Sequence, residues 1–283
     1  MKFCVLGALN MDIVGHISGK TLLHDSNPGS IRFLPGGVGR NIACALAQNG
    51  HKVSLITALG NSPEWAMLKS DCESKGLDLS LCAKSDGASC YMSLHDSSGD
   101  MLLAINDMQA ISALTPDYIN GILPSINQSD GCVIDANLSE ETLIFACERI
   151  KIPIIADAVS MHKCLKLKPC LKYIFALKPN IYEARHMTGR TSPEDCARAL
   201  MGEGVQRVVI SLGSEGVYYA DGESSGYISP LKRFSCQTNG AGDALSAGVA
   251  EGASKGLPAR ECAQIGINYA FRLLSARDAC NFT

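Results

Sequence analysis

The segment over residues 238–244, Thr-Asn-Gly-Ala-Gly-Asp-Ala, contains the residue types that phosphoryl transfer requires. Gly240 and Gly242 precede a run of small residues, 245–252, that predicts a helix, and glycines at a helix start let the backbone approach a ligand closely. The first-turn N–H groups of a helix have no partner within it and favour an anion. Asp243 stands at the same turn, where it can accept a hydroxyl proton. The alternative is that Asp243 only caps the helix.

A second glycine-rich segment, Pro-Gly-Gly-Val-Gly-Arg-Asn over residues 35–41, leads into another predicted helix. The adjacent Gly36 and Gly37 allow the backbone to pack closely against a bound sugar, and Asn41 can both donate to and accept from hydroxyl groups. The alternative is a turn that serves only to reverse the chain. We expect Arg40 to be a surface or structural ion partner.

Asp12 follows the first apolar run, residues 3–7, after Ala-Leu-Asn-Met. At the carboxyl end of a strand its carboxylate can accept two hydrogen bonds from a vicinal diol, although a loop aspartate can also be only a turn residue. The run lacks the Gly-x-Gly-x-x-Gly pattern of dinucleotide-binding strands, and the chain contains no Gly-x-x-x-x-Gly-Lys-Ser/Thr. These absences argue against a nicotinamide-dependent enzyme and against the P-loop kinases.

Two further segments follow predicted strands. Asn180 and Glu183 lie three residues apart at the start of a predicted helix, on one face, where they can orient water or Mg²⁺ around a triphosphate. The alternative is a helix cap, in which each side chain binds the backbone of the other. Ser211, Gly213 and Gly216 belong to a strand and turn that can border a nucleotide or simply close a hairpin.

Short apolar runs alternate with segments of helical spacing, and this alternation predicts the fold class. The runs cover residues 3–7, 53–58, 132–136, 152–156, 173–177 and 208–212. The helical segments are residues 41–49, 140–150, 183–188, 193–201 and 265–274. Strand and helix in regular alternation indicate a mainly parallel sheet covered by helices on both faces. We therefore predict a doubly wound α/β core and a single domain over residues 1–283.

Residues 89–106 break this rhythm. Apolar and polar residues alternate on both sides of the turn Asp-Ser-Ser-Gly at 96–99, which predicts an antiparallel hairpin. With the turn-rich segment from Ile13 to Phe33, the hairpin is predicted to form a small β lid, about residues 13–34 and 88–108. The lid would cover the carboxyl ends of the core strands, where ligands bind in such folds. An exposed lid also offers an edge for pairing, so we expect a homodimer through it.

The composition argues against several classes of function. A net charge of −3, with 25 basic and 28 acidic residues interspersed, provides no cationic field for a nucleic-acid polymer. The apolar runs are far shorter than the ~20 residues that cross a bilayer, so we expect a cytoplasmic protein that binds no membrane. The 13 cysteines include no Cys-x-x-Cys pair and sit mostly among apolar neighbours, which predicts reduced thiols rather than disulfides or zinc.

Taken together and in this order, the segments resemble the two signatures and the Asn-x-x-Glu motif of the ribokinase-like sugar kinases, the phosphofructokinase-B family. The resemblance covers almost the entire chain. It implies a ribokinase-like fold and an ATP- and Mg²⁺-dependent kinase that phosphorylates a hydroxymethyl group on a ribose-like sugar. Asp243 would be the base, and the N–H groups of Gly240, Ala241 and Gly242 would form the anion hole.

The resemblance also implies roles for the other residues of the site. The ribose would be held by Asp12, Asn41 and the backbone of Gly36 and Gly37, with Asn10 in support. Asn180 and Glu183 would organise the metal and the phosphates, Glu183 through a water molecule on Mg²⁺. The ATP side would include Ser211, Gly213, Gly216 and Lys163, with an exposed surface lysine as the alternative for Lys163.

Within the family, residues 25–29, 104–108, 135–141 and 157–163 resemble pseudouridine kinases. The implied reaction converts ATP and pseudouridine into pseudouridine 5′-phosphate. Asn106 and Asp107 offer donors and acceptors that suit the N–H and carbonyl groups of a uracil, and Asn137 would reach the sugar from the opposite side. The alternatives are ribokinase or another nucleoside kinase, which share the catalytic motifs and differ at the lid and at Asn137.

The chain departs from the family pattern at two places. Gln237 stands where relatives usually have an aspartate, two residues before Asn239, and this departure argues against the K⁺ site that the resemblance implies beside the anion hole. The chain also stops at Thr283, soon after the helix predicted for residues 265–274, whereas relatives usually continue through another helix that borders the adenine. An alternative of another class is therefore a nucleoside-binding protein without turnover.

Overall fold

A computed structural model describes residues 1–60, 62–234 and 239–280, with the backbone alone for residues 277–280. The strands are β1 (Lys2–Leu6), β2 (Asn10–Ile17), β3 (Gly29–Gly36), β4 (Lys52–Ile56), β5 (Ala58–Leu59), β6 (Leu77–Asp78), β7 (Ala83–Lys84), β8 (Cys90–His95), β9 (Met101–Asp107), β10 (Gly131–Asp135), β11 (Ile154–Asp157), β12 (Ala176–Lys178), β13 (Arg207–Ser211), β14 (Val217–Asp221) and β15 (Ser225–Ile228). The α-helices are α1 (Val38–Gln48), α2 (Pro63–Ser74), α3 (Pro116–Ile126), α4 (Glu140–Arg149), α5 (Met161–Cys164), α6 (Ile181–Thr188), α7 (Pro193–Gly202), α8 (Ala241–Ser254) and α9 (Ala259–Cys280).

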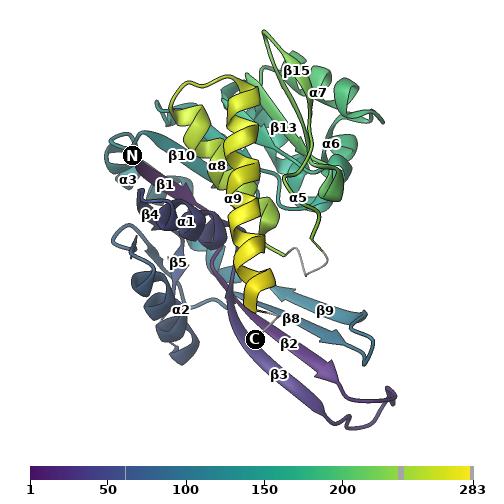
Figure 1. Ribbon diagram of the computed structural model, residues 1–283. Coiled ribbons are helices and arrows are strands. Elements are labelled where there is room, and N and C mark those ends of the chain that lie inside the picture. Colours follow the sequence, from purple (N-terminus) through teal and green to yellow (C-terminus); the bar gives the residue numbers. More distant parts are fainter. Residues whose placement is uncertain (61, 235–238, 281–283) are drawn as a thin grey trace.

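The main sheet has nine strands in the order β15-β14-β13-β12-β11-β10-β1-β4-β6. All neighbouring strands from β13 through β6 in that order run parallel, while β14 and β15 add an antiparallel edge. Parallel strands must be joined by crossovers, and the intervening helices cover the sheet faces. The predicted doubly wound α/β core is therefore confirmed (Figure 1).

The sheet separates two hydrophobic cores, and β1 contributes to both. Phe3 and Val5 pack in the core that contains residues of α1, α8 and α9, whereas Cys4 and Leu6 pack in the core that contains residues of α3, α4, α6 and α7. This division follows from the strand geometry, in which successive side chains point to opposite faces. The helices that carry the two glycine-rich segments, α1 and α8, thus lie on the same side of the sheet.

Two elements differ from the sequence prediction. Residues 165–173 form a 3-10 helix (Leu165–Tyr173) with Pro169 inside it, so the strand predicted to begin at residue 173 begins only at Ala176. Helix α9 is 22 residues long and extends beyond the predicted 265–274 at both ends. Its early start is supported by Asp221 on β14, whose carboxylate accepts a hydrogen bond from the amide of Ala259 at 2.7 Å.

The predicted lid forms a separate sheet of four strands in the order β3-β2-β8-β9, which we call the lid sheet. Strand β2 begins shortly after the carboxyl end of β1 and pairs with β3 in antiparallel and with β8 in parallel orientation, and β8 and β9 form the predicted hairpin. Figure 1 shows the long strands of the lid sheet projecting away from the core.

Two further findings concern the composition. The cysteines that the structure describes are free, and most of them are buried, as predicted. In the described ranges, no helix is both long and apolar enough to cross a membrane.

Candidate active site

Helix α8 starts with a turn that presents backbone amides. Gly240 has a φ of 79°, a left-handed conformation that favours glycine, and Ala241 begins the helix. The first helical hydrogen bond runs from the amide of Ala244 to the carbonyl oxygen of Gly240 at 2.9 Å. The amides of residues 241–243 therefore come before it and point out of the helix start, where an anion is favoured.

Asp243 lies in this first turn and contacts the other glycine-rich segment. Asn41, in the first turn of α1, donates a hydrogen bond from Nδ2 to Asp243 Oδ2 at 2.8 Å. Asn41 Oδ1 accepts in turn from Arg40 at 3.0 Å, and the Arg40 guanidinium forms an ion pair with Asp71 at 2.5 Å. The structure thus supports the expectation that Arg40 is an ion partner. The arginine also orients the Asn41 amide so that its nitrogen faces Asp243.

Asp243 has a strongly perturbed pKa. Burial raises the pKa of Asp243 to about 7, and the charge of Asp157 acts in the same direction, while the Asn41 hydrogen bond and the Lys178 charge partly oppose the shift. A base whose pKa lies near neutrality is ionised often enough to accept a proton and basic enough to hold it. The alternative that Asp243 only caps the helix is not supported, because no side-chain cap hydrogen bond is formed at the α8 start.

Gly36 and Gly37 are required by packing. A Cβ atom on Gly36 would lie 2.4 Å from Asp12 Oδ2, and one on Gly37 would lie 2.3 Å from the carbonyl oxygen of Ala8. Gly37 also has a φ of 104°, which side chains other than glycine rarely adopt. The two glycines let the chain enter α1 directly against Asp12 of β2 and the loop residue Ala8, so Asp12 and Asn41 are brought to the same region.

Asp12 is partly enclosed and held by Asn10. Asn10 Nδ2 donates to Asp12 Oδ1 at 2.5 Å, and Asn10 itself is buried. Burial raises the pKa of Asp12, while the Asn10 hydrogen bond and the Arg40 charge lower it. The support that Asn10 was predicted to provide is therefore seen in the contact with Asp12.

Three charged residues that the sequence reasoning did not assign to the site form a row at the carboxyl ends of adjacent strands. Asp135 on β10 is the register partner of Asp157 on β11, and Asp157 is the partner of Lys178 on β12. All three are buried. Each is the last residue of an otherwise apolar strand, and this is the signal that could have identified them in the sequence.

Lys178 places a buried positive charge beside the α8 start. Its Nζ lies 2.9 Å from Asp157 Oδ2, and Ser246 of α8 donates to the same oxygen at 2.5 Å. Burial alone would lower the pKa of Lys178, but the charges of Asp157, Glu183 and Asp243 outweigh it and raise the pKa, so the amine stays protonated. Its Nζ is 3.6 Å from the point where Gly242 would carry a Cβ.

Asn180 and Glu183 form the cap that was the alternative interpretation. Asn180 Oδ1 accepts from the amide of Glu183 at 2.9 Å, and Glu183 Oε2 accepts from the amide of Asn180 at 2.7 Å. Glu183 is buried, and burial raises its pKa against the opposing charge of Lys178. The capping box fixes the Glu183 carboxylate near Lys178. This structural role is compatible with the predicted role of Asn180 and Glu183 toward metal and phosphates, and that role stays a prediction.

A cavity of about 270 Å³ opens beside the α8 start. Ser211, Gly213 and Gly216 line it and also close the β13–β14 hairpin, so their role toward a nucleotide stays a prediction. The opposite wall comes from α8 and α9, through Ala241, Gly242, Leu245, Ile267, Ala270, Phe271 and Leu274. The cavity therefore joins the turn after β13 to the amides at the helix start.

The lid sheet separates the two residues predicted to touch the base. Asp12 is paired across strands with Leu34 and Tyr91, and Tyr91 is paired with Asn106. Residues paired in this way point to the same face of a sheet, so Asp12, Tyr91 and Asn106 share one face. Asp107 is instead paired with Cys90, and Cys90 with Met11.

The expectation that Asn106 and Asp107 both face the base is therefore corrected, because successive residues of a strand point to opposite faces. Asp107 Oδ1 accepts from the amide of Gln109 at 3.3 Å, which is a turn contact after β9. Tyr91 was not predicted. The sequence signal for Tyr91 is the strict alternation of the hairpin. Once the strand pairing is known, this alternation places Tyr91 on the same face of the lid sheet as Asp12.

Comparison with known proteins agrees with this geometry. The sequence profile of the pfkB family of carbohydrate kinases matches residues 1–281. A pseudouridine kinase of Escherichia coli is 36% identical over an alignment of 289 positions, which covers 99% of this chain and 91% of the relative. A cytidine kinase of Thermococcus kodakarensis is 26% identical, over 94% of this chain and 96% of the relative. The ribokinase of Thermotoga maritima superposes with a TM-score of 0.84 at 21% identity, over 95% of this chain and 91% of that one, which supports the fold.

The chain belongs to the pfkB family of carbohydrate kinases. The ribokinase-like fold and the family resemblance of the sequence motifs are thereby confirmed. As a PfkB carbohydrate kinase, the protein is a phosphotransferase. In this PfkB kinase the cavity lies beside the amide-rich start of α8, and Asp243 lies in the first turn of the same helix.

Two predicted residues of the PfkB kinase bind each other. Lys163 Nζ donates to Asn137 Oδ1 at 2.6 Å, and burial lowers the pKa of Lys163 while the charge of Asp135 opposes that shift. Asp135 also accepts from the amides of Ala8 and Asn137, at 2.9 and 2.8 Å. Lys163 is thus grouped with Asn137, the predicted sugar contact, and it is not an exposed lysine.

One prediction lies outside the described residues of the PfkB kinase. Gln237 falls within residues 235–238, so the interpretation of the K⁺ site stays a prediction from the sequence. A direct protein cage for a metal is also not found: among the described residues, no group of three or more His, Cys, Asp or Glu side chains is arranged to hold an ion.

Proposed function

We propose that this PfkB kinase transfers the γ-phosphoryl group of ATP to the 5′-hydroxyl of pseudouridine and releases pseudouridine 5′-phosphate and ADP. The observation that carries the proposal is the partly buried Asp243 carboxylate, held by Asn41 at the amide-rich start of α8. The choice of nucleoside is supported by the pseudouridine kinase of Escherichia coli, which is 36% identical over 99% of this chain.

In the proposed mechanism, Asp243 accepts the proton of the 5′-hydroxyl as its oxygen attacks the γ-phosphorus. The bond between that phosphorus and the oxygen that bridges it to the β-phosphate breaks, and ADP leaves with the electron pair. The amides at the α8 start, from Gly240, Ala241 and Gly242, face the charge on the transferred group. Preorganised donors of this kind are among the largest contributions to catalysis. The buried ammonium of Lys178 adds a fixed positive charge beside them.

ATP would lie in the cavity beside α8. Its adenosine would contact the turn of Ser211, Gly213 and Gly216 and the apolar wall of α9, with the phosphates directed at the α8 start. Mg²⁺ would supply charge neutralisation on the phosphates, and Glu183 would meet its water shell; the capping box, which fixes the Glu183 carboxylate, supports this role. Asn180 holds that carboxylate in position.

The acceptor would lie between the core and one face of the lid sheet. Asp12, supported by Asn10, would bind the ribose hydroxyls, with Asn41 and the Gly36–Gly37 backbone on the other side. Asn137, oriented by Lys163, would complete the sugar site. Tyr91 and Asn106 share the Asp12 face of the lid sheet, so they are our candidates for contact with the base, Tyr91 by stacking and Asn106 by hydrogen bonding.

A kinase for ribose or another nucleoside is the second candidate function, and it is supported by the cytidine kinase of Thermococcus kodakarensis among the relatives. The test is an ATP-dependent phosphorylation assay with pseudouridine, uridine, cytidine and ribose as acceptors, with Asp243→Asn as the inactive control. We expect kcat/KM to be highest for pseudouridine. A higher value for ribose or cytidine would overturn the acceptor assignment, and acceptor binding without ADP release would favour a nucleoside-binding protein.

We also propose that the kinase is a homodimer joined through the lid sheet. The face opposite Asp12 carries two apolar rows across the strands, Ile13, Phe33, Met92 and Ile105, then Ile31, Leu94 and Leu103 beside Gly15. Phe33 and Leu103 are 54% and 59% exposed. An apolar patch of this kind is typical of a protein interface. Phe33→Asp should convert a dimer into a monomer in sedimentation experiments, and a monomeric wild type would refute the proposal.

A further inference from the structure

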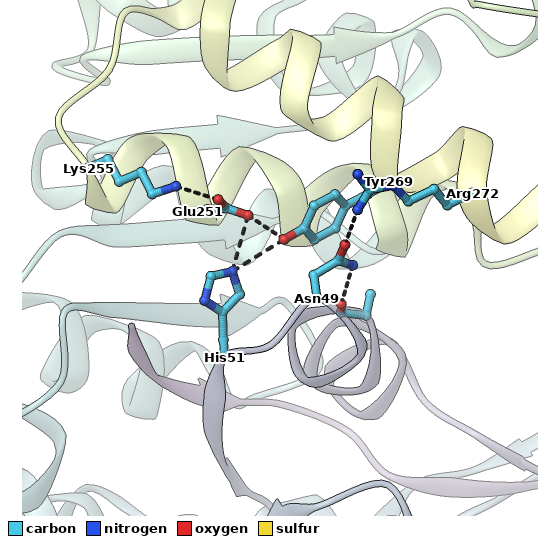
Figure 2. Close-up of polar contacts among 7 residues, drawn as sticks. Asn49, His51, Glu251, Lys255, Tyr269 and Arg272 are labelled. Carbon is cyan, nitrogen blue, oxygen red and sulfur yellow. Dashed lines mark hydrogen bonds and ion pairs between the residues drawn. The ribbon is translucent and has the colours of Figure 1, made fainter.

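A buried polar cluster ties α9 to a turn that lies more than two hundred residues earlier in the chain (Figure 2). His51 Nε2 lies 3.1 Å from Glu251 Oε2 of α8 and 3.3 Å from the hydroxyl of Tyr269 on α9. The Tyr269 hydroxyl donates to the same Glu251 oxygen. We call these three residues the clasp. Just beyond it, Arg272 of α9 donates to Asn49 Oδ1 at 2.6 Å.

The clasp carboxylate is ionised and fully engaged. Burial would raise the pKa of Glu251, but hydrogen bonds from Lys255, Tyr269 and His51 outweigh it and lower the pKa to about 2. The His51 and Glu251 side chains are only 9% and 14% exposed. Hydrogen bonds to a buried charge are directional and strong, and a partner left unpaired is costly. The clasp therefore specifies where Tyr269 must sit relative to α8 and to His51.

Helix α9 carries the clasp and the cavity wall on opposite faces. Ile267, Ala270, Phe271 and Leu274 repeat with helical spacing and line the cavity beside the α8 start. Tyr269 and Arg272 fall on the other face of the same turns, because each residue advances the helix by a fixed rotation. A rotation or shift of α9 that broke the clasp would thus move the cavity wall with it.

Apart from the clasp, helices α8 and α9 contact each other through small residues. A Cβ on Gly248 would lie 2.5 Å from the backbone of Gly266, and one on Gly252 would lie 2.7 Å from the backbone of Cys262. Small residues let the two helices approach closely. At Gly266 the side chains of Leu245 and Val249 pack against α9. The clasp adds directional polar contacts to this apolar packing, and such contacts constrain the rotation of α9 about its own axis.

We propose that the clasp is a positioning unit for the nucleotide, so that His51 and Tyr269, which do not line the cavity, set the affinity for ATP. The inference rests on the proposed function in taking the cavity as the nucleotide site. It makes no assumption about the acceptor.

The test compares Tyr269→Phe and His51→Leu with the wild type in binding adenylyl imidodiphosphate with Mg²⁺, measured by calorimetry without an acceptor. We expect both variants to raise the dissociation constant about three- to tenfold, with the acceptor KM of the active enzyme within about twofold of the wild type. His51→Gln, which keeps a donor near the Nε2 position, should recover most of the affinity. Tyr269→Phe removes only a hydroxyl group and carries the test if His51→Leu does not fold.

The matched control is Lys255→Ala, since Lys255 binds Glu251 Oε1, whereas His51 and Tyr269 both bind Oε2. It should bind the nucleotide as the wild type does. Unchanged nucleotide affinity in Tyr269→Phe together with a lower melting temperature would show that the clasp is only structural and would overturn the proposal. An equal loss of affinity for the nucleotide and for the acceptor would also overturn the proposal. Because the binding measurement contains no acceptor, a wrong assignment of pseudouridine would leave its result unchanged.

Discussion

Asn41 and Asp243 are separated by 202 residues, yet Asn41 Nδ2 donates to Asp243 Oδ2 at 2.8 Å. The contact joins the first turn of α1 to the first turn of α8, the two helices that follow the glycine-rich segments. Arg40 and Asp71 hold the Asn41 amide in the required orientation. The two glycine-rich segments are therefore one structural unit, in which Asn41 of the first segment lowers the pKa of the Asp243 carboxylate in the second.

Replacing Asp243 by Asn should lower turnover by roughly 10²- to 10⁴-fold, the usual contribution of a positioned base. The pKa of Asp243 is raised to about 7, so wild-type activity should rise with pH through that region as the carboxylate ionises. The measurement is kcat/KM for the acceptor between pH 5.5 and 9. Near-normal turnover in Asp243→Asn would remove the residue from the mechanism.

Thermal unfolding of the same variant provides the control for folding. Because the folded-state pKa of Asp243 lies above its ordinary value of 3.8, the folded protein binds a proton that the unfolded chain releases. Wild-type stability from this group therefore falls as the pH rises from about 4 to about 7. The Asp243→Asn variant does not lose this stability. The difference between its melting temperature and that of the wild type should therefore increase in favour of the variant as the pH rises from about 4 to about 7. A difference independent of pH would contradict the raised pKa.

Replacing Asn41 by Ala should shift the pH dependence. The Asn41 hydrogen bond lowers the pKa of Asp243 and so opposes the effect of burial. Without it, the midpoint of the activity profile should move to higher pH, and activity lost at pH 7 should be partly recovered at pH 8.5. Profiles of wild type and variant, measured with saturating ATP, would show the shift. A uniform loss at every pH would mean that Asn41 acts only on the sugar.

Much of the candidate site was accessible from the sequence because its signals are local. The α8 turn needs glycine at the left-handed Gly240 and an acidic residue in the first helical turn, and both are visible without the fold. The lid hairpin shows apolar and polar residues in alternation on both sides of a turn, and the structure contains that hairpin. Asn180 and Glu183 have the spacing of a capping box, and the structure contains that box.

The remaining features depend on register and on contacts between distant segments. The ion pair of Asp157 and Lys178 requires β11 and β12 to be neighbours with those two residues opposed. Which of Asn106 and Asp107 shares the face of Asp12 depends on the pairing of β9 with β8, since a shift by one residue would exchange their faces. No local pattern in the sequence encodes either relationship.

Replacing Lys178 by Met should reduce both stability and turnover. The change leaves Asp157 as a buried charge without its ion-pair partner, which costs about 3–5 kcal/mol in comparable cases. Adding Asp157→Asn should restore much of the free energy of unfolding and should not restore kcat, because the positive charge beside the anion hole is still missing. Denaturant unfolding and kcat of both variants separate the two roles. Recovery of kcat in the double variant would make Lys178 purely structural.

Replacing Gln237 by Asp should increase the response of activity to K⁺. A carboxylate is a hard anionic ligand, which a glutamine amide is not, and alkali cations prefer hard oxygen ligands. The experiment measures kcat at increasing KCl with total ionic strength held constant by tetramethylammonium chloride. A wild-type enzyme that already depends strongly on K⁺ would contradict the interpretation of Gln237.

The lid sheet makes the sharpest prediction about the acceptor, because neighbouring residues of β9 should behave differently. Pseudouridine presents an additional ring N–H where uridine has a carbon, so an acceptor facing that edge would be unpaired with uridine. A lost hydrogen bond of this kind costs about 1–3 kcal/mol. Asn106→Ala, on the Asp12 face, should therefore narrow the pseudouridine-to-uridine preference in kcat/KM by one to two orders of magnitude, while Asp107→Ala should leave it unchanged.

Tyr91 extends the same test to the shape of the base. Its ring shares the face of Asp12 and Asn106, so Tyr91→Phe should keep the affinity for pseudouridine, whereas Tyr91→Leu should raise its KM and leave the KM of ATP unchanged. Met92→Ala is the matched control, because Met92 is the next residue of β8 and lies on the opposite, exposed face. Equal effects of Asn106→Ala and Asp107→Ala would show that the base is not read by one face of the lid sheet. A wild-type enzyme that prefers free ribose would show that the base is not recognised at all.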